Sequence, residues 1–248
     1  MDYRPGGRIK TLRIVCLLLF PFFLRAERIA LLTYPFSDSS WIMYNMIQLS
    51  SRGFLVDDDS FHNFGISIND EPPFLHVFQP IEINYFNPKC DKLILLIKDY
   101  REVLINYLES TGEEIHRWLD RMGHSDLRAR SVQDPDWYFH NLYLYDQWNP
   151  QNRLLIYYED LINHPKLILK KLLDFVGGSD YKLNRHIENL AIHHQYFSKF
   201  RPTHRIYSEG FKGLKIDLSP SLESKIKNKF SKAYPSLYEK YLKRYDGM

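Results

Sequence analysis

Short apolar runs alternate with longer amphipathic segments along most of this chain. Short, mostly apolar runs predict strands at 29–33, 74–78, 92–97 and 153–157, and the run at 92–97 is of the continuous kind that is buried on both faces of a parallel sheet. Apolar stripes at helical spacing predict helices at 42–47, 100–109, 136–148, 165–176, 182–192 and 221–234. Strands that alternate with helices indicate right-handed βαβ units around a parallel sheet.

Polar or charge-mixed segments lie between these elements. Residues 57–72 are acidic and rich in turn formers, which predicts a surface loop. Residues 112–133 predict a helix followed by a lid-like loop, and the Lys- and Tyr-rich stretch 225–244 predicts an amphipathic surface helix. No linker divides residues 27–248, so we expect a single domain there.

The first 26 residues have the three-part pattern of a secretory signal peptide. A basic stretch precedes an 11-residue apolar run at 14–24, and a cleavage site follows at 24–26. A spanning helix needs about 20 apolar residues, so we expect no stable membrane span once the leader is removed. We predict a signal peptide at 1–26, a folded domain at 27–248 and export to a secreted, periplasmic or ER/Golgi luminal location. The alternative is a cytoplasmic protein whose leader is not functional.

Composition places the chain among globular proteins, with 44% hydrophobic and 25% charged residues. The formal net charge is +3, but five of the 33 basic residues and one of the 30 acidic residues lie within residues 1–26. The remaining 28 basic and 29 acidic residues leave a net charge of −1. This balance does not favour nucleic acid as a partner, because nucleic-acid binding requires a basic face on the folded domain.

Cysteine and histidine usage excludes two further kinds of site. Cys16 lies in the leader and leaves Cys90 alone, so there is no intramolecular disulfide framework and no Cys-based metal site. No Cys, Asp or Glu cluster completes the histidines of the C-terminal half, so we expect no metal. These histidines are His186, His193, His194 and His204.

Residues 28–48 combine an apolar strand, a hydroxyl-rich turn and a helix start. Backbone N–H groups at a helix N-terminus, together with the helix dipole, form a ready site for an anion. Ser37, Ser39 and Ser40 add hydroxyl donors. Trp41 offers a ring face on which an adenine could stack. An ordinary strand–turn–helix with Ser and Asp capping is the alternative interpretation.

The turn reads Tyr34-Pro35-Phe36-Ser37-Asp38-Ser39-Ser40-Trp41. It resembles the phosphosulfate-binding loop of sulfotransferases that use 3′-phosphoadenosine 5′-phosphosulfate (PAPS), which reads Tyr-Pro-(Lys/Arg)-Ser-Gly-(Thr/Asn/Ser)-(Thr/Ser)-Trp. Phe36 stands at the basic position and Asp38 at the glycine position. Both departures remove features that help to hold an anion, and the Asp38 carboxylate repels phosphate. The resemblance implies that the serine hydroxyls and Trp41 bind the donor nucleotide.

A second block follows the strand at 92–97 and reads Lys98-Asp99-Tyr100-Arg101-Glu102-Val103. It is similar to the family's strand end, where an Arg and a Ser eight residues later hold the 3′-phosphate of the cofactor. The two positions here are Lys98 and Asn106. Lys keeps the charge without the guanidinium fork, and Asn keeps a donor. The alternatives are a solvated strand end for Lys98 and a capping or packing amide for Asn106.

A third block, at 153–177, contains Tyr158-Glu159-Asp160-Leu161, with Pro165 placed to start a helix and Gly177 to end it. It is similar to the family's Tyr-Glu-Asp-Leu block, whose Tyr touches the nucleotide. The resemblance gives that role to Tyr158.

A fourth block reads Gly210-Phe211-Lys212-Gly213 and is similar to the family's Arg-Lys-Gly clamp on the 3′-phosphate. The resemblance assigns Gly210 to the cofactor site. Ser208 and Glu209 precede it, so the clamp charges are missing unless Lys212 or Arg205 substitutes.

The family's chemistry needs a base for the acceptor hydroxyl, which some members place on a short strand within a Lys-Thr-His element. The nearest stretch is His76-Val77-Phe78, in which His76 takes the Lys position and Phe78 the His position. His76 would point into the cleft and act as the catalytic base, since an unperturbed His has a pKa of about 6.5. A half-buried structural histidine is the alternative, and Glu71 and Glu82 are alternative bases.

The four blocks occur in the family's order over residues 28–240. The resemblance implies an α/β fold, a three-layer α/β/α sandwich with a central parallel sheet related to P-loop nucleotide-binding proteins. It also implies transfer of a sulfuryl group from PAPS, as donor co-substrate, to a hydroxyl or amine of a glycan, lipid or small molecule. The replaced site residues leave a catalytically degenerate binding module as the alternative. A kinase ranks last, because the Gly-x-x-x-x-Gly-Lys-Ser/Thr loop is missing.

Overall fold

The computed structural model describes residues 27–34, 37, 39–50, 54–56, 74–77, 90–123, 136–190, 192 and 219–247. Within this part of the chain, five strands form one sheet in the order β2-β3-β1-β4-β5, and each neighbouring pair is parallel. The strands are β1 (Ile29–Thr33), β2 (Phe54–Val56), β3 (Phe74–Val77), β4 (Lys92–Ile97) and β5 (Arg153–Tyr157). The carboxyl ends of β1, β4 and β5 therefore lie along one edge of the sheet.

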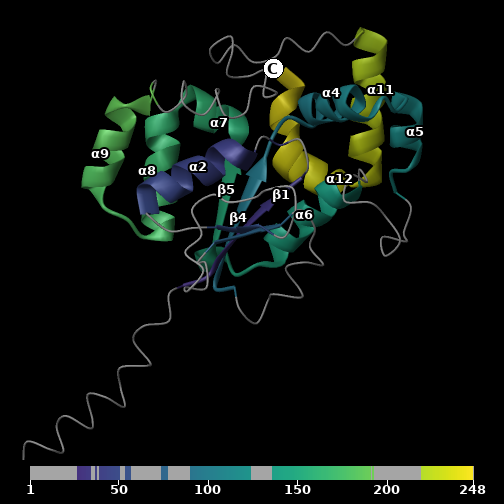
Figure 1. Ribbon diagram of the computed structural model, residues 1–248. Helices are drawn as coiled ribbons and strands as arrows, with labels where there is room; N and C mark the ends of the chain where they lie inside the picture. The colour runs from purple at the N-terminus through teal and green to yellow at the C-terminus, as the bar shows by residue number, and fades with distance from the viewer. Residues whose placement is uncertain are drawn as a thin grey trace, which may run out of the picture.

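Two groups of helices cover the sheet (Figure 1). One group consists of α2 (Ser39–Ser50), α7 (Tyr158–Asn163), α8 (Pro165–Val176) and α9 (Asp180–Glu188). The other consists of α4 (Tyr100–Thr111), α5 (Ile115–Asp120), α6 (Asp136–Gln147), α11 (Pro220–Ala233) and α12 (Pro235–Leu237). The short helical turns are η4 (Pro150–Asn152), η6 (Tyr238–Leu242) and η7 (Lys243–Gly247).

The side chains of β4 show that the sheet separates two hydrophobic cores. Leu93, Leu95 and Ile97 pack into the cluster that contains residues of α4, α5, α6 and α11. Ile94 and Leu96 pack into the opposite cluster, with residues of α2, α7, α8 and α9. Alternation of buried residues between two faces requires helices on both sides, so the molecule is a three-layer α/β/α sandwich and the predicted fold class is confirmed.

Most predicted elements are confirmed, with small changes at their ends. The strands at 29–33, 92–97 and 153–157 and the helix at 165–176 have the predicted bounds. Pro165 starts α8, and Gly177 ends it with a positive φ of 75°, which a residue without Cβ adopts at little cost. α2 begins at Ser39, three residues earlier than predicted, and α9 ends at Glu188, four residues earlier. β2 and α7 were not predicted. The predicted loop at 57–72 lies outside the described residues.

The prediction of one amphipathic surface helix at 225–244 is wrong. α11 ends at Ala233, the chain turns at Pro235, and the residues after it pack into the core. Leu242 and Tyr245 have no exposed surface. The rings of Tyr241 and Tyr245 can be buried because their hydroxyls have hydrogen-bond partners. Tyr241 donates to Asp146, and Tyr245 donates to Glu159.

Candidate functional site

The turn between β1 and α2 places a serine hydroxyl at the carboxyl edge of the sheet. The Ser37 backbone N–H donates to the Tyr34 carbonyl at 3.2 Å, and α2 begins two residues later at Ser39. Ser37 is buried, and its Oγ has no hydrogen-bond partner among the residues that the structure describes. A buried hydroxyl without such a partner at a helix start is a donor for an anion.

Trp41 lies in the first turn of α2 and packs inside the protein. Its ring stacks on the ring of Tyr44, with centroids 5.6 Å apart and an interplanar angle of 11°. The Asn45 side-chain amide donates to the Trp41 carbonyl at 2.7 Å, and the amide oxygen of Asn45 accepts from His186 Nε2 at 2.7 Å. The start of α2 is therefore held by α9, and the predicted stacking of Trp41 on adenine stays a prediction.

Lys98, immediately after β4, is fully buried, so the alternative of a solvated strand end is wrong. Its Nζ lies 3.1 Å from the Glu102 carboxylate and 5.0 Å from the centroid of the Tyr158 ring. The Lys98 carbonyl accepts a hydrogen bond from the Tyr138 hydroxyl at 2.7 Å. The structure thus brings together two residues, Lys98 and Tyr158, that the sequence assigns to the cofactor site.

Asn106 lies on α4, one helical turn after Glu102, and is half-buried. Residues one turn apart share a helix face, so Asn106 lies on the side of α4 that carries the partner of Lys98. The N-terminus of α4 is capped by Asp99, whose carboxylate accepts from the Arg101 backbone N–H at 2.9 Å and also pairs with the Arg101 guanidinium.

A partly buried carboxylate, Glu159, joins the ends of β4 and β5. Its Oε1 accepts from the Asp99 backbone N–H at 2.7 Å, and its Oε2 accepts from the Tyr245 hydroxyl at 2.9 Å. Burial, with a smaller contribution from the neighbouring Asp99 charge, raises the pKa of Glu159 to about 7, although the hydrogen bonds that it accepts lower the pKa in part. Sequence reasoning missed both Glu102 and Glu159. Their positions in the sequence could have identified them, since Glu102 lies four residues after Lys98 and Glu159 directly follows Tyr158.

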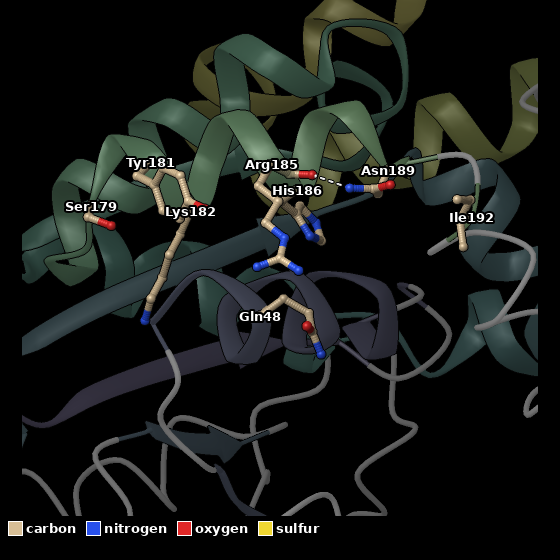
Figure 2. Close-up of a pocket in the computed structure, with 8 residues that line it drawn as sticks. All are labelled: Gln48, Ser179, Tyr181, Lys182, Arg185, His186, Asn189 and Ile192. Carbon is tan, nitrogen blue, oxygen red and sulfur yellow. Dashed lines mark hydrogen bonds between the residues drawn. The ribbon is translucent and has the colours of Figure 1, made fainter.

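A pocket of about 570 Å³ lies between α2 and α9. Figure 2 shows the Arg185 guanidinium extending from α9 toward Gln48 on α2. The lining residues are Gln48, Ser179, Tyr181, Lys182, Arg185, His186, Asn189 and Ile192. No predicted site residue lines this pocket. His186 connects this pocket to the candidate site, because its partner Asn45 also bonds the Trp41 carbonyl.

Several predicted site residues can be placed only in part. His76 lies in β3, in register with Leu31 of β1 and Val56 of β2. Gly210 and the alternative bases Glu71 and Glu82 lie outside the described residues.

Within the described part of the chain, no three His, Cys, Asp or Glu residues gather in a way that could hold a metal ion. The helices described there are all too short or too polar to cross a bilayer.

The parallel sheet, its covering helices and the hydroxyl-bearing turn between β1 and α2 define an α/β protein of the P-loop nucleotide-binding type. A family model described as the sulfotransferase domain matches residues 11–241. The chain belongs to the sulfotransferase domain family.

Named relatives show the same likeness at low identity. The mouse (Mus musculus) protein sulfotransferase 2A6 is 25% identical over 175 residues, which cover 63% of this chain and 61% of that protein, less than two thirds of its length. The structure of mouse sulfotransferase SULT7A1 complexed with PAP has a TM-score of 0.56, with 17% identity and 89% of each chain covered. A retinol dehydratase in complex with retinol and PAP has a TM-score of 0.52, with 12% identity, 87% of this chain and 83% of that chain covered. At these identities the solved structures show the fold alone.

Proposed function

We propose that this protein transfers a sulfuryl group from PAPS to a hydroxyl or amine acceptor. The observation that carries the proposal is the buried Lys98 held over the Tyr158 ring, at the edge of the sheet where the β1–α2 turn also ends. Ligands of open parallel sheets bind at the carboxyl ends of strands, near the point where the strand order reverses. That point lies here between β1 and β4, because β2 and β3 follow on one side of β1 and the chain then crosses to β4 and β5 on the other side.

The residues present fit a nucleotide that carries phosphates. Ser37 Oγ has no hydrogen-bond partner among the described residues, and it lies on the turn before a helix N-terminus, which favours an anion. Lys98 supplies a cation and Asn106 an amide donor on the next helix. The names of the solved relatives support the same ligand, since mouse SULT7A1 and the retinol dehydratase were solved with PAP.

When bound, PAPS would supply the sulfuryl group and leave as 3′-phosphoadenosine 5′-phosphate (PAP). A new bond forms between the acceptor oxygen or nitrogen and sulfur, while the bond from sulfur to the phosphate oxygen of PAPS breaks. The acceptor proton moves to a base, for which we propose His76. Ser37, Ser39 and Ser40 would hold phosphate oxygens, Lys98 and Asn106 the 3′-phosphate, and Trp41 and Tyr158 would flank the nucleotide rings. Gly210 completes the proposed set of cofactor residues.

The experiment is calorimetric titration of the full chain with PAP, compared with the Ser37→Ala and Ser179→Ala variants. We expect micromolar binding, and we expect Ser37→Ala to weaken it by about tenfold or more, as for a lost hydrogen bond to a charged group. Ser37→Ala should not lower the unfolding temperature, because its hydroxyl bonds none of the described side chains. Ser179→Ala, in the α2–α9 pocket, is the matched control and should bind like the native protein.

A catalytically degenerate binding module is the second candidate, and one contact favours it. The Glu102 carboxylate, 3.1 Å from Lys98 Nζ, neutralises the cation that the nucleotide would need. Absence of heat and of thermal shift up to millimolar PAP, with no shift on addition of ATP and Mg²⁺, would support this second candidate. A thermal shift with ATP and Mg²⁺, but none with PAP, would instead indicate a kinase.

We propose a small hydroxyl-bearing molecule as the acceptor class, on the support of the retinol dehydratase structures solved with retinol and with androsterone. We also propose that residues 1–26 direct export. The family match begins at residue 11, inside this segment, so the leader needs a direct test. N-terminal sequencing of the protein recovered from cells decides it: a mature end at residue 27 supports export, and an end at residue 1 or 2 overturns it.

A further inference from the structure

We propose that Glu159 is a positioning residue for the candidate donor site. It fixes Lys98 against Tyr158 through hydrogen bonds with the residues that follow β4 and with the C-terminal segment. The effect of Glu159 on PAP binding rests on the proposed function. The hydrogen bonds of Glu159 do not depend on that proposal.

The ends of β4 and β5 need such a connection, because the backbone hydrogen bonds between the two strands stop just before the candidate donor site. The last register pair between β4 and β5 joins Ile97 to Tyr157. Beyond this pair, β4 leads into α4 and β5 leads into α7. The two helices have no backbone hydrogen bonds of the sheet type to hold them together. The Asp99 N–H is among the donors that a helix start leaves open. Glu159 Oε1 accepts from it at 2.7 Å, two residues beyond the final ladder pair.

This bond acts on the two predicted cofactor residues through the backbone. Lys98 immediately precedes Asp99, and Tyr158 immediately precedes Glu159. A tie between Asp99 and Glu159 therefore sets the separation of Lys98 and Tyr158, whose Nζ and ring centroid lie 5.0 Å apart. Without this hydrogen bond, the residues that follow β4 and β5 are free to move apart.

The second carboxylate oxygen connects the same point to the C-terminal segment. Glu159 Oε2 accepts from the Tyr245 hydroxyl at 2.9 Å. The Tyr245 carbonyl accepts from Arg101 Nη2 at 3.0 Å, and Arg101 is paired with Asp99 at 2.6 Å. We call Asp99, Arg101, Glu159 and Tyr245 the strand-end clasp. All four are mostly shielded from water, so their bonds are shielded from solvent competition.

A charge is not needed for this geometry. A glutamine at position 159 can accept from the Asp99 N–H through Oε1 and donate through Nε2 to the Tyr245 oxygen. Burial disfavours the charged form of Glu159 and raises its pKa to about 7, so the carboxyl is only partly ionised at neutral pH. Shape, rather than charge, is therefore the property that the positioning role requires.

The test compares Glu159→Ala with Glu159→Gln in the full chain by calorimetric titration with PAP. We expect Ala to weaken PAP binding by about tenfold or more and Gln to stay within about threefold of the native affinity, because Gln keeps both bonds. Asp160→Ala is the matched control. Its carboxylate is the next in the chain, but it pairs with Arg244 outside the clasp, and the variant should bind PAP normally. Equal weakening by Ala and Gln, or unchanged affinity in Ala, would overturn the proposal.

Amide hydrogen exchange at Asp99 supplies a readout that needs no nucleotide. We expect the Asp99 amide to lose protection in Glu159→Ala and to keep it in Glu159→Gln, while β4 exchanges as in the native protein. This measurement separates the two proposals. If the native chain binds no PAP, the proposed function fails, yet selective deprotection of Asp99 in the Ala variant still supports the clasp. Equal exchange in all variants overturns it. Where Glu159→Ala does not fold, Tyr245→Phe removes one bond of the clasp and should give a smaller loss of the same kind.

Discussion

Lys98 illustrates what a charged side chain needs in order to be fully buried. Its ammonium group has the Glu102 carboxylate at 3.1 Å and the face of the Tyr158 ring at 5.0 Å. Removing one partner of a buried ion pair is costly, because the remaining charge has neither water nor a counter-charge. The Lys98–Glu102 pair therefore contributes to folding as well as to the candidate site.

We expect Lys98→Met to lower the free energy of unfolding by about 3–5 kcal/mol, the cost of removing one partner of an ion pair that is shielded from water. Lys98→Met combined with Glu102→Gln should recover most of that loss, since it removes both charges. Urea denaturation followed by circular dichroism measures the change. Lys170→Met is the control, because Lys170 forms an i,i+4 pair with Asp174 on an exposed surface and its loss should change little. A double variant no more stable than the single one would contradict the prediction.

Glu159 makes the stability of the fold depend on pH in a defined direction. Its pKa is about 7 in the folded protein and about 4.3 in an unfolded chain, so the folded state binds the proton more tightly. The stability that comes from the neutral carboxyl is fully present below the unfolded value and is lost as pH rises through the folded value. The Glu159→Gln variant, which stays neutral, should gain stability relative to the native protein by about 2 kcal/mol between pH 5 and pH 8. Urea titrations of both proteins at the two pH values test this, and a difference that does not change with pH would refute it.

The roles of single residues were only partly readable from sequence. Lys98 was identified by its place after an apolar strand, but its burial was not, because a strand-end lysine is usually solvated. The Glu102 partner four residues later was the missed signal. Glu159 was missed for a different reason: an acidic residue in the first turn of a helix is ordinary on a surface, and its partner Tyr245 lies 86 residues further along the chain.

At the scale of elements, α2 and α9 are joined by one buried amide. Asn45 Nδ2 donates to the Trp41 carbonyl at 2.7 Å, and Asn45 Oδ1 accepts from His186 Nε2 at 2.7 Å. Because the amide oxygen can only accept, the His186 ring carries its proton on Nε2. The bond fixes the first turn of α2, where the candidate nucleotide site begins.

Asn45→Ala should lower the free energy of unfolding by about 1–3 kcal/mol, since it leaves the His186 donor without this acceptor in a buried site. Asn189 provides the matched control: its Nδ2 donates to the Arg185 carbonyl at 2.8 Å, the same bond to the residue four positions earlier, but on an exposed surface. Asn189→Ala should be nearly neutral, because water replaces the bond. Thermal and urea unfolding of both variants decide the point, and equal losses would show that burial of the amide is unimportant.

The elements that sequence predicted best are those whose pattern is set by burial on both faces. β4 reads Lys-Leu-Ile-Leu-Leu-Ile and was predicted to the residue, because both cores require apolar side chains. The C-terminal segment was predicted wrongly, since alternating Tyr and Lys residues resemble a solvated helix. Tyrosine is compatible with either environment, and only tertiary partners such as Asp146 decide which one it occupies.

At the scale of the whole molecule, the sheet keeps two hydrophobic cores apart. Phe230 lies in the core beneath α11, where its ring centroid is 5.2 Å from that of Phe139. Leu172 lies on α8 in the core on the other face of the sheet. Both are fully buried. The sheet between them is continuous through β1 and β4, and the two clusters of described residues have no member in common.

This arrangement predicts that mutations in different cores act independently. Phe230→Leu and Leu172→Val should each cost about 1 kcal/mol, and the double variant should equal their sum within about 0.5 kcal/mol. Phe230→Leu combined with Phe139→Leu, which are in contact within one core, should deviate from additivity by more than that. Urea denaturation of the six proteins in these two cycles measures both coupling energies. If the coupling across the sheet matched the coupling within one core, the sheet would be transmitting strain between its faces, and a substitution beneath α8 would then reach the strand ends that carry Lys98 and Tyr158.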